Sequence, residues 1–169
     1  MTADEKRIAV CSFTGHRTVK TGHVSALPGL VDRAIAYAYD RGARVFLAGG
    51  AVGFDTLAAS RVILFKLTHP DIRLELILPC LDQTEGWSAA DRERYDFVLS
   101  RADEVEIVSD SYFKGCMKKR NERLAMRADM LIAYADGQKP YSGTMQTVRM
   151  ANARGIEVYN LYPTLEKAK

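Results

Sequence analysis

Three short stretches of the chain combine glycines with polar side chains that could hold an anion. They read CSFTGHR at 11–17, LAGGAVGFDTLAA at 47–59 and YSGTMQTVRMANARG at 141–155. In each stretch an apolar run comes first, small residues follow, and a helix-like pattern comes next. Glycine lets the backbone approach a phosphate closely, and the free N–H groups at the start of a helix attract anions. We therefore expect the three loops to form one rim for a nucleotide or a nucleotide derivative.

The first loop offers four candidate ligand residues. Thr14 supplies a hydroxyl donor, Gly15 supplies a flexible position, and His16 and Arg17 are polar groups at the same end of the sheet. Arginine suits bidentate contact with phosphate. A lone histidine is usually a structural or surface residue, so His16 is either a ligand contact or a residue of that kind.

The second loop carries three candidate glycines and one carboxylate. Gly49 and Gly50 follow a strand-like run, and Gly53 precedes a helix-like one. These glycines either let the backbone cradle a phosphate or only let the helix and the strand pack closely. Asp55 falls in the first helical turn, where it either binds a ribose hydroxyl or caps the helix.

The third loop opens the last long helix with Ser142, Gly143 and Thr144. Together they offer N–H and hydroxyl donors to an anion. Ser142 and Thr144 are also ordinary N-cap residues, but a glycine at position 143 is less expected in a helix that binds nothing.

Several familiar sites are missing from the sequence. The glycine spacing matches neither the dinucleotide fingerprint GxGxxG nor the phosphate loop GxxxxGK[ST], which argues against ordinary NAD dehydrogenases and ATPases. No HxxxH, HExxH or acidic cluster suggests a metal. The three cysteines lack a CxxC pair, which argues against a disulfide framework or a zinc site. We therefore expect no metal and no cofactor.

Composition favours one globular domain spanning residues 1–169. The chain has 47% hydrophobic and 27% charged residues, and 24 Lys and Arg stand against 21 Asp and Glu. This charge balance gives little reason to expect a non-specific nucleic-acid or membrane binder. The start MTADEKRIAV does not resemble a signal peptide, and no apolar stretch approaches a membrane span. We expect a soluble protein of the reducing cytoplasm.

The elements that must position these loops alternate along the chain. Strand-like apolar runs occupy 7–13, 43–48, 73–79, 103–108, 129–135 and 156–161. Segments with helical spacing separate them, including 115–127 and 143–154. Six strands joined by helices predict an α/β, Rossmann-like three-layer fold with a mostly parallel sheet. The fourth strand alternates charged and apolar residues, which suits a sheet edge. In such folds ligands bind at the carboxyl ends of the strands.

The region after the third strand leaves two alternatives open. Trp87 either stacks on a base or packs as a hydrophobic staple before a helix that Ser88 caps. Cys80 stands at a strand end, but no partner base is identifiable for it. We interpret Cys80 as a buried structural thiol rather than a nucleophile.

Read together, FTGHR, GGAVGFD, KKRNERLAMRADMLIAY and SGTMQTVRMA resemble the YpsA-like branch of the SLOG superfamily. That superfamily also contains the DNA-processing protein DprA and the LOG phosphoribohydrolases. The resemblance implies a Rossmann-like fold that binds nucleotides or nucleotide-derived molecules, often as a homodimer. It also adds two candidate ligand residues, because Arg120 matches the arginine of the LOG "RK" motif and Asn121 stands in place of the lysine.

The sequence departs from the LOG pattern where catalysis would occur. The acid of the motif PGGxGTxxE falls on Thr147, which cannot act as a carboxylate, and Pro140 and Tyr141 precede SGT. We therefore expect binding or sensing of a phosphorylated, nucleotide-like small molecule, with no catalytic residue assigned. One alternative is a nucleotide N-glycosidase that uses another carboxylate, such as Asp55 or Glu122.

A third reading is binding of single-stranded DNA in the manner of DprA. It predicts a continuous basic groove with aromatic platforms. The sequence offers one basic cluster, around Lys118 to Arg123, without clear aromatic interleaving. We therefore expect a small molecule and a second copy of the chain as partners, and we do not expect nucleic acid or a membrane.

Overall fold

The structure is a computed structural model that describes residues 7–168. Its elements follow one another as β1 (Val10–Gly15), the short 3-10 helix η2 (Thr21–His23), α1 (Leu27–Asp40), β2 (Val45–Ala48), α2 (Phe54–Lys66), β3 (Arg73–Leu78), α3 (Ala89–Arg101), β4 (Glu104–Ile107), α4 (Cys116–Arg127), β5 (Met130–Tyr134), α5 (Gly143–Ala153), β6 (Glu157–Asn160) and α6 (Tyr162–Lys167).

The six strands form one sheet in the order β4-β3-β2-β1-β5-β6, and every neighbouring pair is parallel. This confirms the predicted Rossmann-like α/β fold. The alternating fourth strand does lie at an edge of the sheet, as its pattern predicts. Parallel neighbours need crossover connections, and the helices between the strands supply them.

The first strand ends later than the sequence predicts. Thr14 pairs with Ala133 and Gly15 pairs with Tyr134, so both residues belong to β1 rather than to the loop after it. The reason is tertiary, since β5 lies beside β1 and extends its pairing past the apolar run. Thr14 is therefore held by the sheet itself.

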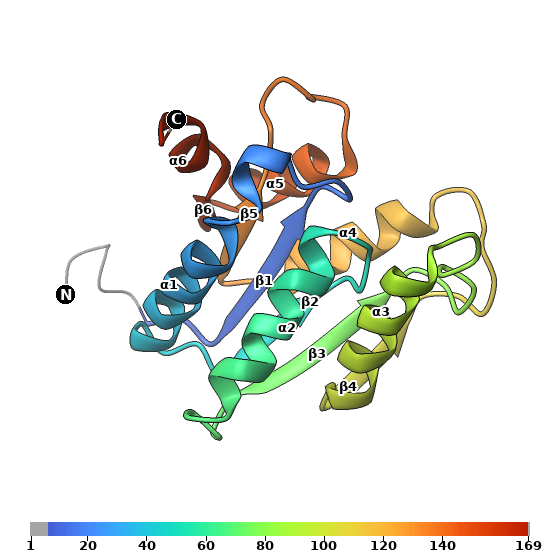
Figure 1. The fold of residues 1–169 in the computed structure, drawn as a ribbon, viewed down its shortest axis with the longest axis horizontal. Helices are drawn as coiled ribbons and strands as arrows, with labels where there is room; N and C mark the ends of the chain where they lie inside the picture. Colours follow the sequence, from blue (N-terminus) through green and yellow to red (C-terminus); the bar gives the residue numbers. More distant parts are fainter. Residues whose placement is uncertain (1–6, 169) are drawn as a thin grey trace.

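The chain covers the two faces of the sheet in two passes. α1, α2 and α3 join β1 to β4 on one face, and α4 and α5 return on the other (Figure 1). The strand order therefore reverses between β1 and β5. Loops that leave these two strands diverge to opposite faces, and this is the place where open α/β sheets bind ligands.

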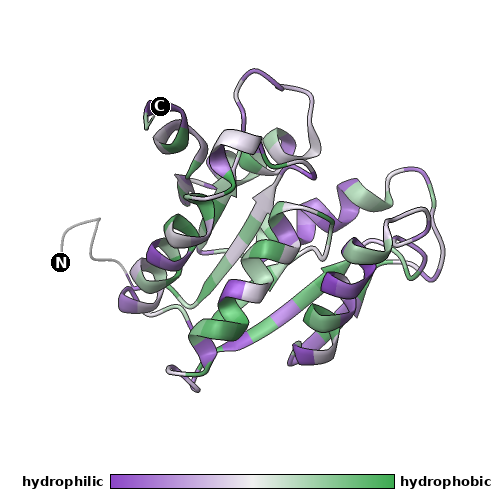
Figure 2. Cartoon of the chain, in the orientation of Figure 1, coloured by the Kyte–Doolittle hydropathy of each residue, from purple (hydrophilic) through white to green (hydrophobic). Residues whose placement is uncertain are grey.

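The main core lies between the sheet and the first helical layer. Phe13 and Phe46 stack with ring centroids 6.1 Å apart, and Phe54 meets Phe13 edge to face at 6.4 Å. All three rings are fully buried. Hydrophobic and hydrophilic residues alternate along α1 and α3 in Figure 2, as expected for helices that bury one side.

The start of α3 decides the role of Trp87. The Ser88 hydroxyl oxygen accepts the N–H of Asp91 at 3.1 Å, so Ser88 is the N-cap that the sequence predicts. Trp87 packs edge to face on Tyr95 at 5.5 Å and contacts the main core. The tryptophan therefore anchors this helix against the core. In the described part of the chain, no helix has the length and apolarity needed to span a membrane.

Candidate functional site

A polar cavity of about 320 Å³ opens at the carboxyl end of β1. Ten of the thirteen predicted site residues line it: Thr14, Gly15, His16, Arg17, Asp55, Arg120, Asn121, Ser142, Gly143 and Thr144. They come from β1 and the segment after it, the first turn of α2, the middle of α4 and the start of α5. We call this space the polar cavity.

Three further residues of the polar cavity carry no signal in the sequence. Ala51, Met117 and Leu124 complete its lining. They are ordinary apolar side chains. Met117 and Leu124 reach the cavity because α4 packs against β1, and Ala51 lies in the segment between β2 and α2. Contacts of this kind depend on tertiary packing, so no sequence motif predicts them.

Arg120 is the buried cation of the site. Its Nη1 donates to the carbonyl oxygen of Gly49 at 2.7 Å, and its Nε donates to Oδ1 of Asn121 at 2.9 Å. A Cβ on Gly49 would lie only 2.4 Å from Nη1, so glycine is needed there for the guanidinium to approach. Burial lowers the pKa of Arg120, while the nearby Asp55 raises it. Gly49 thus supports the cavity from behind and does not line it.

Asp55 is the buried anion of the site. Its Oδ2 accepts the N–H of Ala51 at 3.3 Å, and its Oδ1 has no hydrogen-bond partner among the described residues. The N-cap of α2 is Gly53, so Asp55 does not cap the helix. Burial raises the pKa of Asp55 to about 6, against the lowering effect of the Arg120 charge. One carboxylate oxygen therefore remains free to accept a hydrogen bond.

His16 is held as a neutral ring. Its Nε2 accepts the backbone N–H of Asp136 at 2.8 Å, which places the remaining proton on Nδ1. The ring meets Tyr134 edge to face at 6.0 Å. Burial lowers the pKa of His16, Lys139 lowers it further, and Asp136 acts in the opposite direction. Nε2 of His16 therefore holds the backbone of Asp136, and Nδ1–H remains available as a donor.

The start of α5 presents free donors to the cavity. The Ser142 hydroxyl oxygen accepts the N–H of Met145 at 3.1 Å, which makes Ser142 the N-cap. Within residues 7–168, the N–H groups of Gly143 and Thr144 have no acceptor. The hydroxyl groups of Thr14 and Thr144 are likewise not bonded to any described residue. All four groups are available to donate to a bound anion.

Arg17 stands at the rim of the polar cavity, and Gly53 packs against the backbone of Arg17. Arg17 is exposed, and no described residue pairs with its guanidinium. Gly53 adopts a φ of 86°, and a Cβ there would lie 2.1 Å from the carbonyl oxygen of Arg17. Gly50 lies apart from the polar cavity, where a Cβ would approach Leu78 and Gln83. Gly49, Gly50 and Gly53 are thus the three predicted site residues outside the lining.

The other candidate catalytic groups lie elsewhere. Among the residues that line the polar cavity, Asp55 is the only carboxylate, whereas Glu122 is exposed on α4. Thr147 is buried, and its hydroxyl donates to the carbonyl oxygen of Gly143 at 2.9 Å. Cys80 is buried, and burial raises its thiol pKa to about 12, which removes it as a nucleophile at neutral pH. No group of three His, Cys, Asp or Glu residues that could hold a metal occurs within the described residues.

An all-parallel sheet with a polar cavity where its strand order reverses defines a Rossmann-like α/β protein. The model of the YspA SLOG family (YpsA) matches residues 14–164, and the chain belongs to this family. This confirms the resemblance seen in the sequence.

The chain is also similar to relatives along most of its length and to one solved structure in its fold. UPF0398 proteins of Bacillus thuringiensis (strain Al Hakam) and Bacillus cereus (strain AH187) are each 28% identical over 163 residues, covering 90% of this chain and 88% of the relative. DNA processing protein A from Helicobacter pylori superposes with a TM-score of 0.62 at 20% identity. That match covers 94% of this chain and 67% of the other, and it supports the fold alone.

Proposed function

We propose that the protein binds a phosphorylated nucleotide or a nucleotide-derived small molecule in the polar cavity. The observation that carries this proposal is the polarity of the cavity. Unpaired N–H groups of Gly143 and Thr144 line it together with the buried carboxylate of Asp55, which keeps one oxygen free. The cavity thus has donors at one end and an acceptor at the other, which suits a ligand with an anionic group and a hydroxyl donor.

The arrangement predicts how the ligand lies. Its phosphate sits at the start of α5, where the helix dipole and the free N–H groups favour negative charge. Arg17 closes over the phosphate from the rim. The Asp55 carboxylate would repel the phosphate, so we place the neutral ribose beside it. A ribose hydroxyl then donates to Oδ1 of Asp55. Arg120 stays behind Asp55 and offsets its charge.

Calorimetric titration with AMP and with adenosine tests the proposal. The two compounds differ only in the phosphate, so we expect AMP to bind at least about tenfold more tightly, which corresponds to about 1.4 kcal/mol. Equal affinities would remove the phosphate from the proposal. Failure of AMP, ADP, GMP and UMP to bind at all would contradict it.

Turnover at this site is a second candidate, and the observation that favours it is the pKa of Asp55. A carboxyl group with a pKa of about 6 titrates near neutral pH, as a general acid or base of a glycosidase must. If the protein releases a nucleobase from a nucleoside monophosphate, Asp55→Asn should abolish release and Glu122→Gln should not. Unchanged release in Asp55→Asn would exclude this carboxylate as the acid.

Binding of single-stranded DNA is favoured by a different observation. DNA processing protein A from Helicobacter pylori is described as binding single-stranded DNA. In this chain the apolar rings of Tyr112, Phe113 and Tyr141 are 62%, 37% and 96% exposed, and Nζ of Lys119 lies 5.7 Å from the Phe113 ring centroid. Sequence reasoning overlooked Tyr112 and Phe113, which come shortly before the basic cluster in the chain.

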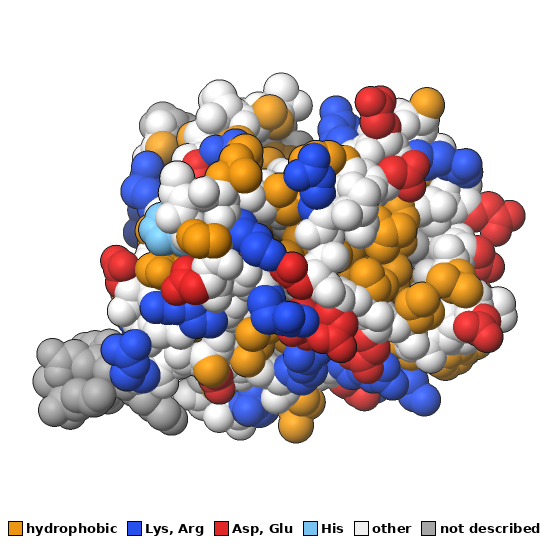
Figure 3. Space-filling view, turned by 90° about the horizontal axis from the view of Figure 1, so that it is seen from below, with side chains coloured by type: hydrophobic (Ala, Val, Ile, Leu, Met, Phe, Trp, Pro, Cys, Tyr) orange, Lys and Arg blue, Asp and Glu red, His pale blue; other side chains and the backbone are white. Residues whose placement is uncertain are grey.

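The charge balance of the chain speaks against a strong DNA interface. The 24 Lys and Arg residues stand against 21 Asp and Glu, and Figure 3, which views the molecule from below, shows both signs mixed on that face. We therefore expect an oligothymidine to bind weakly, with a shallow dependence on salt. Fluorescence anisotropy of a labelled 20-mer, titrated at about 50 to 300 mM salt, measures both the affinity and its salt dependence. A submicromolar dissociation constant that depends steeply on salt would make DNA the ligand, provided that the double variant Tyr112→Ala with Phe113→Ala loses this binding.

A further inference from the structure

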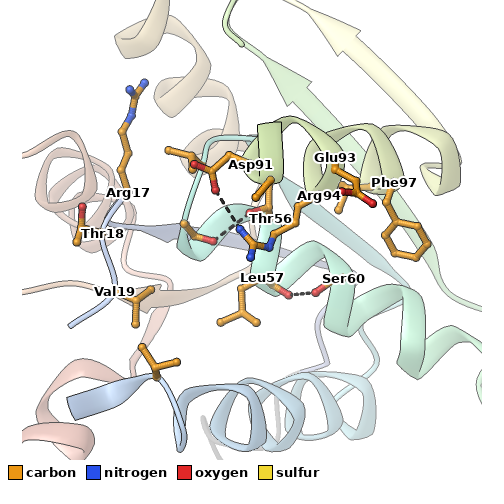
Figure 4. A pocket seen from close by; sticks show the side chains of 15 residues that line it. Arg17, Thr18, Val19, Thr56, Leu57, Ser60, Asp91, Glu93, Arg94 and Phe97 are labelled. Carbon is orange, nitrogen blue, oxygen red and sulfur yellow. Dashed lines mark hydrogen bonds and ion pairs between the residues drawn. The ribbon is translucent and has the colours of Figure 1, made fainter. Parts of the chain in front are cut away.

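A second and larger hollow lies next to the polar cavity. It measures about 920 Å³ and runs between the segment 17–19, the first turns of α2 and the start of α3 (Figure 4). We call it the groove. Ligand sites typically span about 300–1,000 Å³, so the polar cavity lies near the lower end of this range and the groove near the upper end.

The two hollows share one wall. The segment after β2 and the first turn of α2 form it: Ala51 and Asp55 line the polar cavity, whereas Val52, Gly53 and Thr56 line the groove. Arg17 lines both. Neighbouring residues of one turn thus line different hollows, so this turn separates the two spaces.

The groove has the surface that a ring system with a polar edge would need. Val19, Val24 and Leu57 give it an apolar side, and Phe97 from α3 extends that side (Figure 4). Val24 and Phe97 are 56% and 45% exposed although they are apolar. Such side chains lose their contact with water when a ring covers them, and this stabilises the complex.

Polar groups border the apolar side. Nη1 of Arg94 donates to Oδ1 of Asp91 at 3.1 Å, and Figure 4 shows this pair beside Thr56. The Thr56 hydroxyl donates to the carbonyl oxygen of Gly53 at 3.2 Å and keeps an acceptor for a ligand. In ligand sites, a few hydrogen-bonding groups beside an apolar surface fix the orientation of a ring such as a base or a nicotinamide.

We infer that the ligand is of the dinucleotide class, with one phosphorylated nucleoside in the polar cavity and the second nucleoside in the groove. Arg17 lies between them and contacts the phosphates that join the two halves. The inference rests on the proposed function and deepens it, because it requires the mononucleotide site and adds a second compartment. A mononucleotide would leave the groove empty.

The test compares NAD with AMP in calorimetric titrations of the full chain. We expect NAD to bind at least tenfold more tightly than AMP. The double variant Val24→Ser with Phe97→Ser should lower NAD affinity about three- to tenfold and leave AMP affinity unchanged. Both side chains are exposed, so the fold should tolerate the change. Leu67→Ser with Met126→Ser is the matched control, since these apolar side chains are also exposed and line neither hollow.

The outcomes separate the inference from the proposed function. If AMP binds and NAD binds no more tightly, or if the groove variant leaves NAD affinity unchanged, the inference fails and the proposed function stands. An equal loss for AMP and NAD would also overturn it. If neither compound binds, the proposed function fails and the inference falls with it.

Discussion

At the residue scale, Asp55 carries a conflict between stability and ligand binding. Burial raises its pKa from 3.8 to about 6, so the folded state disfavours the charged carboxylate. The contribution of Asp55 to the free energy of unfolding should therefore fall as the pH rises from about 4 to 6 and then level off. Since one pKa unit corresponds to about 1.4 kcal/mol, the full cost above pH 6 is about 3 kcal/mol.

Asp55→Asn removes this cost. We expect the variant to unfold at higher urea than the wild type at pH 7, to match it near pH 4, and to bind AMP at least tenfold more weakly. Urea unfolding at the two pH values measures the stability difference. A variant less stable than the wild type at pH 7 would mean that contacts of the carboxylate outweigh its burial.

Arg120 makes the opposite prediction. Arg120→Met leaves Asp55 without its nearby cation and the Gly49 carbonyl without its donor, so we expect a loss of about 3 kcal/mol at pH 7. Adding Asp55→Asn should recover part of that loss. Arg123→Met on the same helix is the control, because the pair of Arg123 with Glu106 is half-exposed and is worth less than about 1 kcal/mol. Equal losses in the two single variants would contradict the account.

Residue chemistry explains which parts of the site the sequence predicts. Arg17, Ser142 and Thr144 are recognisable because guanidinium and hydroxyl groups that follow a strand can donate to an anion, although Ser142 also caps α5. Gly49 is recognisable as special, but its partner Arg120 lies 71 residues away, so its role under the guanidinium cannot be predicted from spacing. Apolar lining residues such as Leu124 leave no signal at all.

At the scale of elements, two helix caps allow a matched comparison. Ser142 caps α5 beside the polar cavity, and Ser88 caps α3 outside it, each with its hydroxyl oxygen 3.1 Å from a backbone nitrogen. Changing either serine to alanine should cost about 1 kcal/mol in thermal unfolding. Only Ser142→Ala should weaken AMP binding, because it loosens the free N–H groups of Gly143 and Thr144. The same affinity loss in both variants would refute a site at α5.

The turn before α2 requires a glycine at position 53. Gly53 has a φ of 86°, and a Cβ would meet the backbone of Arg17. Gly53→Ala should therefore cost at least about 2 kcal/mol and displace the segment that carries Arg17, which weakens AMP binding as well. Gly137→Ala is the control, since nothing lies within 4 Å of a Cβ at that position. Calorimetric unfolding that shows no difference between the two variants would contradict this geometry.

Local sequence pattern decides whether a segment forms a strand, but pairing with neighbouring strands decides where that strand ends. Apolar runs predict all six strands. A parallel sheet covered on both faces buries most residues of its central strands β1, β2, β3 and β5, whereas the edge strands β4 and β6 are more exposed. The end of β1 depends on β5, more than 100 residues later in the chain, and local pattern carries no information about that neighbour. This is why Thr14 and Gly15 are strand residues although the sequence places them in a loop.

At the scale of the whole molecule, alternation of strands and helices predicts the fold class but not the order of the strands. The order matters most for the site, since it brings α4 and α5 to the carboxyl end of β1 and closes the polar cavity. It also places α2 and α3 around the groove, which no motif indicates. Association into a homodimer stays a prediction, which sedimentation velocity can test.

The most direct test of the account is the affinity of AMP for the wild type, for Arg17→Gln and for Arg92→Gln, measured by calorimetry. Both arginines are exposed and neither side chain pairs with another described residue, so neither change should alter stability. Only Arg17 lines the polar cavity. The account predicts that AMP binds the wild type and Arg92→Gln equally and binds Arg17→Gln at least tenfold more weakly. No binding to the wild type, or equal binding to all three proteins, would contradict a nucleotide site in the polar cavity.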